Sequence, residues 1–254
     1  MNRVLTLAAF NIRAILSEKT GIVLAWALFA LQLAIYGTLM SHLVSAKIQN
    51  YFFFYAIGLM IITVFDAGSF LGRRFVESAH DGELPYYLSL PVSRRGFLGS
   101  QAILGVANIL LRVLPPLIAI LAFLGRLTIS GVVFAILALS LLGLGISGIM
   151  ISLSFIAFKS VDIYTAIIAG LSALLVRFST VFYPLIFVPN FYSPIAVLSP
   201  LTYGSDLTRW VLGFDPTFLL NPILTAVVVS AVAVATLALS AGIVDRVIEG
   251  VKAA

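Results

Sequence analysis

RRFVESAHDGELPYYLSLPVSRRGFLG, residues 73–99, is the one long polar interval in an otherwise apolar chain. Four arginines and three carboxylates make it so, namely Arg73, Arg74, Arg94, Arg95, Glu77, Asp81 and Glu83. Because charged groups are costly to remove from water, this interval must be solvated. Its middle part, from Glu83 to Pro91, is a short amphipathic segment with prolines near both ends. The pattern predicts a short helix held between two membrane spans, well placed to receive a cytoplasmic partner and transmit force.

Composition places the rest of the chain in a membrane. Of 254 residues, 61% are hydrophobic and 10% are charged, whereas roughly a quarter of the residues in a soluble domain are charged. A water-soluble fold could not cover its surface with so few charges. The absence of cysteine excludes disulfides, thiolate catalysis and cysteine-based metal sites. Basic residues are not clustered among exposed aromatics, so the net charge of +5 does not indicate nucleic-acid binding.

Apolar runs of about 20 residues predict an all-α membrane protein with six transmembrane helices in one domain, residues 1–254. The predicted spans are about 21–40, 51–72, 97–125, 131–158, 163–182 and 218–243, with a cytoplasmic coupling loop at 73–96. Residues 1–20 have an apolar and a polar helical face, which predicts an N-terminal interfacial helix. A disordered lead-in is the alternative for those residues.

The segment 183–215 is apolar but too rich in proline for one straight span. Short re-entrant or interfacial helices at the outer surface fit it best, packed against protein so that the irregular backbone finds hydrogen bonds.

Positive charges set the orientation of the chain in the membrane. With both termini in the cytoplasm, ten basic residues lie inside (Arg3, Arg13, Lys19, Arg73, Arg74, Arg94, Arg95, Lys159, Arg246 and Lys252) and three outside (Lys47, Arg126 and Arg209). We therefore predict cytoplasmic termini.

Three charges fall within predicted spans: Asp66, Arg112 and Arg177. Such charges are costly at membrane depth, so each is expected to be paired or to face an aqueous path. Asp66 and Arg177 lie toward span ends, where snorkelling to the interface is the alternative.

Pro115-Pro116 should kink the third span. The glycines of Gly143-Leu144-Gly145-Ile146-Ser147-Gly148 lie within a span, so they predict close helix packing rather than dinucleotide binding.

The chain has no catalytic, metal-binding or phosphate-binding motif. We therefore expect no enzyme activity, no metal and no cofactor on this chain, and an energy source on another polypeptide if transport is uphill.

Three features together resemble the membrane subunit of an ABC-2 type (type V) ABC exporter. They are the six-span layout with its N-terminal helix, the loop GELPYYLSLPVSRRGFLGSQ (residues 82–101), and the stretch FSTVFYPLIFVPNFYSPIAVLSPLTYGSDLTRWVLG (residues 178–213). The resemblance covers essentially the whole chain.

The resemblance implies a permease of the cell membrane that assembles with a second permease, identical or related, and with two cytoplasmic ATPase subunits that bind ATP and Mg. Residues 81–90 would be the coupling helix. The implied ATPase-docking residues are Glu77, Asp81, Glu83, Leu84, Tyr87, Leu88 and Arg94. The implied residues of an outer re-entrant cap are Pro200, Thr202, Tyr203, Asp206 and Arg209. The translocation path would lie between the permeases, along spans one, two and five.

Many polysaccharide-exporting members of that family line their channel with aromatic residues. The predicted fifth span here has only Tyr164, Phe178 and Phe182, so a lipid-like, drug-like or peptide substrate is expected. The main alternative is a secondary carrier or channel driven by an ion gradient, which predicts paired intramembrane carboxylates and internal repeats. The two halves of the chain show no such repeat. A membrane protein with a structural or assembly role is a third reading.

Overall fold

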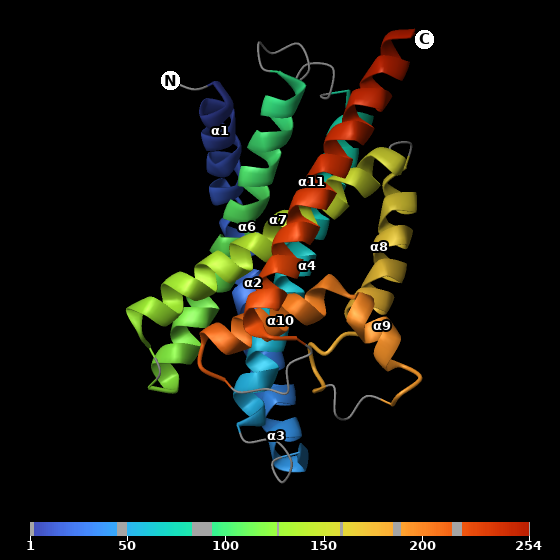
Figure 1. The fold of residues 1–254 in the computed structure, drawn as a ribbon. Coiled ribbons are helices and arrows are strands. Elements are labelled where there is room, and N and C mark those ends of the chain that lie inside the picture. Colours follow the sequence, from blue (N-terminus) through green and yellow to red (C-terminus); the bar gives the residue numbers. More distant parts are fainter. Residues whose placement is uncertain are drawn as a thin grey trace.

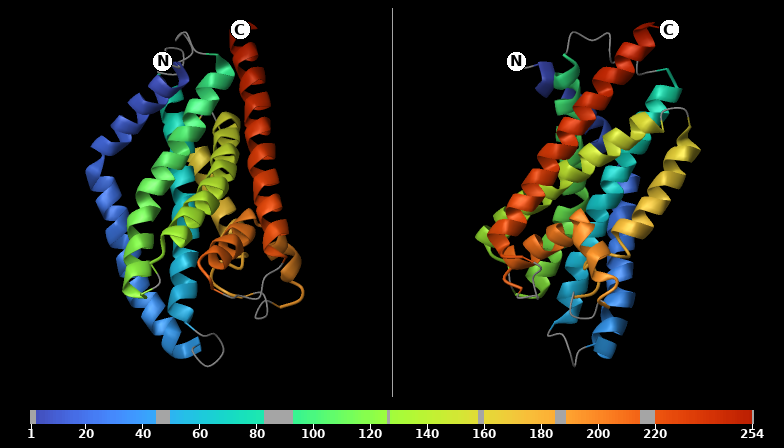
Figure 2. Two further views of the ribbon diagram at one scale, coloured as in Figure 1. Left: turned by 60° about the vertical axis from the view of Figure 1, so that its left-hand side comes forward. Right: turned by 45° about the vertical axis from the view of Figure 1, so that its right-hand side comes forward.

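The computed structural model describes residues 3–44, 50–82, 93–125, 127–157, 160–184, 189–214 and 220–253, and all regular structure in these ranges is helical. Both termini lie at one end of the molecule and α3 lies at the opposite end (Figure 1; Figure 2). The elements in chain order are α1 (Arg3–Ser17), α2 (Lys19–Gln32), the π-helical turn η1 (Leu33–Gly37), α3 (Thr38–Val44), α4 (Tyr51–His80), α6 (Arg94–Phe123), α7 (Ile129–Ile156), α8 (Val161–Leu175), α9 (Ser193–Leu198), α10 (Pro200–Val211) and α11 (Pro222–Ala253).

Among the described residues, five helices are long and apolar enough to cross a membrane: Lys19–Leu43, Tyr51–His80, Arg95–Phe123, Ile129–Ile156 and Pro222–Ile243. The chain is thus a multi-pass membrane protein by helix length and composition. These helices overlap the predicted spans one, two, three, four and six. The predicted fifth span is represented by α8, which has 15 residues and is shorter than the roughly 20 residues that cross the hydrocarbon core. A sixth crossing therefore stays a prediction.

The polar interval at residues 73–99 is helical at both of its described ends. Helix α4 continues past the expected boundary at Gly72 to His80, and the exposed i,i+4 ion pair of Arg73 with Glu77 (2.8 Å) supports this extra length. The chain leaves the helix through Gly82, whose φ of 77° suits a residue without a side chain. Helix α6 begins at Arg94, and the Ser93 hydroxyl accepts a hydrogen bond from the Gly96 amide (3.1 Å). The loop predicted at 73–96 is therefore shorter than expected.

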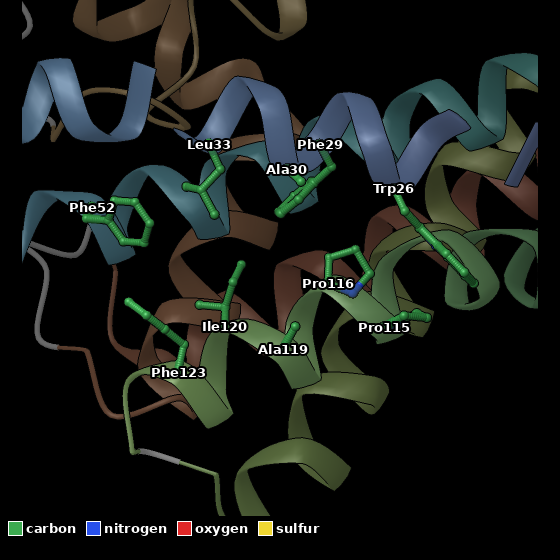
Figure 3. A pocket seen from close by; sticks show the side chains of 10 residues that line it. All are labelled: Trp26, Phe29, Ala30, Leu33, Phe52, Pro115, Pro116, Ala119, Ile120 and Phe123. Carbon is green, nitrogen blue, oxygen red and sulfur yellow. The ribbon is translucent and has the colours of Figure 1, made fainter. Parts of the chain in front are cut away.

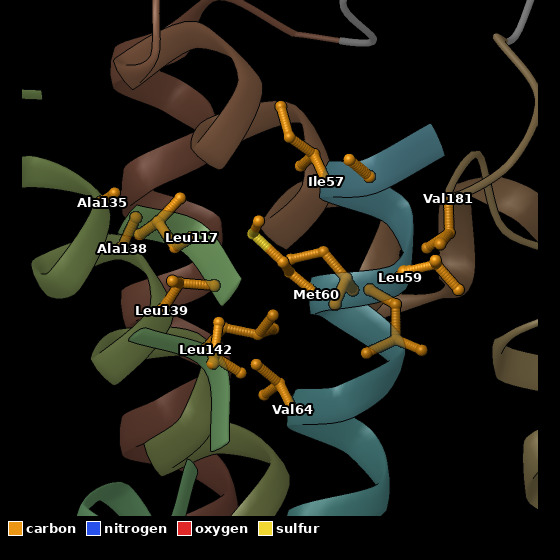
Figure 4. Close-up of a cluster of buried hydrophobic side chains, with 14 of the residues drawn as sticks. Ile57, Leu59, Met60, Val64, Leu117, Ala135, Ala138, Leu139, Leu142 and Val181 are labelled. Atoms are coloured by element: carbon orange, nitrogen blue, oxygen red, sulfur yellow. The ribbon is translucent and has the colours of Figure 1, made fainter. Parts of the chain in front are cut away.

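The main core lies where α4 packs against α6 and α7 (Figure 4). Met60 and Val64 of α4 point toward Leu139 and Leu142 of α7, and all four are nearly or completely buried. Apolar side chains fill this core, and they pack in this way whether the surrounding solvent is lipid or water. Helix α4 is the most enclosed of the five candidate spans, so it forms the central rod of the fold.

The glycines of the fourth span do serve close packing, as the sequence predicts. A Cβ atom added at Gly148 of α7 would lie 2.8 Å from the carbonyl carbon of Thr236 and 2.9 Å from the amide nitrogen of Leu237 on α11. The two backbones can approach this closely only because residue 148 has no side chain. Thr236 strengthens the contact by donating a hydrogen bond from its hydroxyl to the Gly145 carbonyl (3.0 Å).

Helix α1 is amphipathic and packs on α6, and the chain bends between α1 and α2 (Figure 2). Its buried residues are Ala8, Asn11 and Ile15. Asn11 is polar yet only 6% exposed, whereas the apolar side chains of Leu5 and Leu16 are exposed. The buried face of α1 thus includes a polar residue, and Asn11 lines a small pocket together with Gln101 of α6. The place of α1 at the membrane surface stays a prediction.

Candidate functional site

The predicted outer region contains two short helices, α9 and α10, each with a proline in its first turn. Proline suits this position because it has no N–H to leave without a partner. The junctions between helices are closed by hydroxyl groups. Ser199 donates to the Leu175 carbonyl at the end of α8 (2.8 Å), and Thr202 donates to the Ala196 carbonyl of α9 (2.7 Å). In the described part of this segment, the carbonyls at these two junctions thus find donors within the protein.

Arg209 lies at the centre of this region and is 1% exposed. Its guanidinium donates hydrogen bonds to the Thr180 carbonyl (3.2 Å), the Ser205 hydroxyl (3.2 Å), the Phe54 carbonyl (3.4 Å) and the Val181 carbonyl. It also lies over the Phe54 ring, 3.6 Å from the ring centroid. One side chain thereby joins α10, the turn after α8 and the first turns of α4.

The charge of Arg209 is retained despite complete burial. Desolvation lowers the pKa of Arg209 to about 10, and the carboxylate of Asp206 opposes this change. The guanidinium is therefore protonated at neutral pH. Asp206 lies 3.6 Å from it and is 4% exposed. A buried ion pair of this kind rarely adds stability compared with apolar residues, but it holds its partners in one arrangement.

The five predicted cap residues all belong to α10, but they lie on different faces. Thr202, Asp206 and Arg209 are spaced by four and three residues, so they share the buried face. Pro200 and Tyr203 instead lie beside Leu142 of α7 and Val229 of α11. Thr202, Asp206 and Arg209 thus make the buried polar contacts of α10. Pro200 and Tyr203 pack α10 on the neighbouring spans.

The charges expected within spans differ in their surroundings. Arg112 of α6 is half-buried; its Nε donates to the Asn108 side chain (3.1 Å), and its guanidinium lies 5.3 Å from the centroid of the Phe70 ring on α4. Asn108 in turn donates to the Ala67 carbonyl of α4 (3.2 Å). Asp66 has an exposed side chain and lies midway along α4, not close to its end.

Arg177 is not inside a helix. It follows α8 in a turn and its side chain is exposed, so it lies outside the helix that represents the predicted fifth span. Its place at membrane depth stays a prediction. Helix α8 ends at Leu175. The hydroxyls of Ser179 and Thr202 then take part in hydrogen bonds with the backbone at Val176, Thr180 and Val181, which hold the following residues in a turn.

The proline pair of α6 leaves the Leu111 carbonyl without its usual intrahelical donor, because Pro115 has no N–H. Trp26 of α2 takes this role and donates its indole N–H to the Leu111 carbonyl (3.2 Å). The contact fixes α2 against α6 at the proline pair. Farther along the first span, η1 is a π-helical turn, a feature that is frequent at functional sites.

An apolar pocket of about 520 Å³ lies between the proline pair and η1 (Figure 3). This volume falls in the range of about 300–1,000 Å³ that is usual for small-molecule sites. The pocket is lined from α2 and η1 by Trp26, Phe29, Ala30 and Leu33, from α4 by Phe52, and from α6 by Pro115, Pro116, Ala119, Ile120 and Phe123. Its only side-chain donor, the Trp26 indole, is already bonded to Leu111.

The predicted docking residues are described only in part. Glu77 forms its ion pair with Arg73 on the last turns of α4, and Asp81 follows that helix. Glu83, Leu84, Tyr87 and Leu88 lie outside the described residues, as does the side chain of Arg94. Within the described residues, no cluster of three or more His, Cys, Asp or Glu side chains is arranged to hold a metal.

Sequence reasoning missed Trp26, Asn108 and Phe54. A usable signal existed for the first, since a proline pair inside a span calls for an external donor and the chain has two tryptophans. Asn108 is a polar residue one helical turn before Arg112, which also suggested a pair. Nothing in the sequence pointed to Phe54, because it is joined to Arg209 across 155 positions.

No protein-family model matches this chain, and neither does any curated protein.

Proposed function

We propose that this chain is the transmembrane permease subunit of an ATP-driven ABC exporter of the ABC-2 type. In this account it moves a lipid-like, drug-like or peptide substrate out of the cytoplasm. Two cytoplasmic ATPase subunits supply the energy, and a second permease, identical or related, completes the assembly. The protein lies in the cell membrane with both termini in the cytoplasm. Support comes from the order of sequence motifs that resemble the family and from one feature of the fold.

That feature is the unbroken course of α4, which joins the predicted docking segment to the predicted cap. Helix α4 has 30 residues, so at about 1.5 Å per residue it is about 45 Å long. Near its start, Phe54 is held by Arg209 of α10. Its other end reaches His80, next to the segment proposed to dock on the ATPase.

This geometry supports a lever mechanism. A shift of the docking segment when the ATPases close would tilt α4 as a rigid body. Because Arg209 binds the Phe54, Thr180 and Val181 carbonyls together, α10 and the turn after α8 would follow that tilt. The outer cap would then move in step with ATP binding, although the two ends lie about 45 Å apart along α4.

Affinity capture tests the docking step. The wild-type chain, purified from its native membrane, should bring an ATPase subunit with it. Glu83→Lys reverses a charge and Leu84→Asp places a charge on an apolar contact, so each should release the ATPase while the chain stays folded. Leu43→Asp is the matched control, since Leu43 is 77% exposed near the opposite end of the molecule. Equal capture by all four proteins would contradict the proposed docking segment.

The ion-gradient carrier is the second candidate because Asp66 is an ionisable group midway along a candidate span. It predicts uptake or release by the chain alone in a proton or sodium gradient, with loss of transport in Asp66→Asn. The permease proposal predicts no gradient-driven transport by the chain alone.

A further inference from the structure

The apolar pocket continues into a charged region along one face of α6. Arg112, Pro116, Ala119 and Phe123 are spaced by four, three and four residues, so they share that face. Side chains on a helix incline toward its N-terminus. Arg112 therefore extends from the proline pair toward the end where α6 begins, away from the pocket, and its guanidinium reaches Phe70 of α4.

Charges of both signs meet at this end of the pocket. Glu18 and Asp66 both lie near enough to act on the charge of Arg112. Glu18 also lies 3.7 Å from Arg74 of α4. Among the described residues, neither carboxylate forms an ion pair with Arg112, whose Nε is bonded to Asn108 and whose terminal amino groups have no hydrogen bond. The terminal N–H groups of the guanidinium can therefore donate to a further anionic oxygen.

The pocket itself suits a hydrocarbon chain. From Pro115 to Phe123 it follows eight residues of α6, or about 12 Å at the usual rise. Phe29 and Leu33 are buried in its depth, whereas Pro115, Ala119 and Phe123 are exposed. The pocket is thus open on its α6 side, toward the lipid that would surround α6. A chain entering from there would leave no unsatisfied polar group behind.

From these features we infer that α2, α4 and α6 form a binding slot for a phospholipid-like amphiphile with a zwitterionic head. Its alkyl chain lies in the pocket between Trp26 and Phe123, its phosphate binds Arg112, and its ammonium lies beside Asp66 and Glu18. A head with a phosphate alone would be repelled by the two carboxylates, and an ammonium alone by Arg112 and Arg74. In calling this amphiphile the exported cargo, the inference rests on the proposed function.

The head group should dominate selectivity. An alkyl chain that moves from a bilayer into an apolar pocket gains no hydrophobic free energy, because lipid tails are equally apolar. The charge-assisted hydrogen bonds that Arg112 would donate to the phosphate have no equivalent among the contacts that lipid tails offer in the hydrocarbon core. Affinity should therefore change strongly with the head group and weakly with chain length.

Fluorescence of Trp26 provides the test. The chain has two tryptophans, so a Trp210→Phe background leaves Trp26 as the sole reporter. This protein, in detergent and without any ATPase, is titrated with phosphatidylethanolamine whose chains carry bromine, a quencher at short range. Diacylglycerol with the same brominated chains serves as the probe without a charged head. We expect saturable quenching by the phospholipid and only weak, non-saturating quenching by diacylglycerol.

Variants separate the two parts of the slot. Ala119→Phe fills the pocket and should abolish saturable quenching, whereas Ile118→Phe, at an exposed neighbour outside the pocket, should not. Ala30→Phe fills the same space from α2 and replaces Ala119→Phe if that protein does not elute as a single species. Arg112→Gln should weaken binding of phosphatidylethanolamine about tenfold, a typical value of one charge-assisted bond.

The proposed contact of Asp66 with the ammonium is tested by whether Asp66→Asn weakens or strengthens the binding of each lipid. Asp66→Asn should weaken binding of phosphatidylethanolamine but strengthen binding of brominated phosphatidic acid, because it removes both the ammonium partner and the repulsion of a second negative charge. Equal quenching by all the lipids, unaffected by Ala119→Phe and Ala30→Phe, would overturn the slot. Because the titration needs no ATPase, a failed slot and a failed docking experiment can be told apart.

Discussion

Replacing Arg209 by methionine should destabilise the packing of α10 against α4 and the turn after α8, and the size of the effect follows from the contacts of Arg209. The change keeps an unbranched side chain but removes four donated hydrogen bonds and the cation over Phe54. It also leaves the buried carboxylate of Asp206 without its cation 3.6 Å away. Hydrogen bonds to charged groups contribute about 1.5–3 kcal/mol each, but the recovered desolvation energy of the guanidinium offsets much of that sum. Removing one partner of a buried ion pair costs about 3–5 kcal/mol, which is the loss we expect.

Thermal unfolding of the purified chain in detergent measures this loss. One kcal/mol corresponds to a Tm change of about 2–4 °C for chains of about this size, so Arg209→Met should lower Tm by roughly 6–20 °C. Arg177→Met is the matched control, because Arg177 is an exposed arginine in the same region and should change stability by less than about 0.5 kcal/mol. Adding Asp206→Asn to Arg209→Met should recover part of the loss by neutralising the buried carboxylate. Equal Tm values for Arg209→Met and Arg177→Met would refute the conclusion that the contacts of Arg209 stabilise the packing of α10 on α4.

Two further substitutions test the packing of the spans. Gly148→Ala places a methyl group against the α11 backbone and should destabilise the protein by about 1–3 kcal/mol. The control is Gly170→Ala, where a Cβ meets nothing within 4 Å, and it should leave Tm unchanged or raise it. Equal effects of the two variants in thermal unfolding would count against the close contact of α7 with α11. Trp26→Phe keeps the aromatic ring but removes the donor to the Leu111 carbonyl, so we expect a loss of about 1 kcal/mol. The Pro115→Ala variant restores the intrahelical donor, and Trp26→Phe should cost less in that background; an undiminished cost would show that the indole does not compensate for the proline.

The long helices and the all-helical membrane class could be predicted from sequence because both depend on local composition. Apolar runs without charges have one stable state in a bilayer, and residue order alone identifies them. The same local rule misplaces the end of α4, because the charges of Arg73, Arg74 and Glu77 predict a loop where the helix continues to His80. Polarity ends a membrane span but does not end a helix, and no glycine or proline lies between Gly72 and Gly82.

The candidate site was less predictable because its contacts join distant residues. Arg209 was counted as one outer positive charge, yet it is completely buried against Phe54, 155 positions earlier. The Trp26 bond to Leu111 spans 85 positions and depends on the angle between α2 and α6. The apolar run that contains α8 has the length of a span but divides at Leu175 into a helix and a hydrogen-bonded turn, which run length alone does not predict. These features are tertiary, and among them only the Trp26 contact has a local signal, the proline pair that leaves a carbonyl without its donor.

The most direct test of the proposed function is ATP hydrolysis by the chain captured from its native membrane and placed in lipid nanodiscs. The account predicts that a stoichiometric ATPase accompanies the chain, that hydrolysis requires Mg, and that both the partner and the activity are lost in Glu83→Lys and Leu84→Asp but kept in Leu43→Asp. A chain that is captured alone, shows no nucleotide-dependent activity and transports in an ion gradient through Asp66 would contradict it.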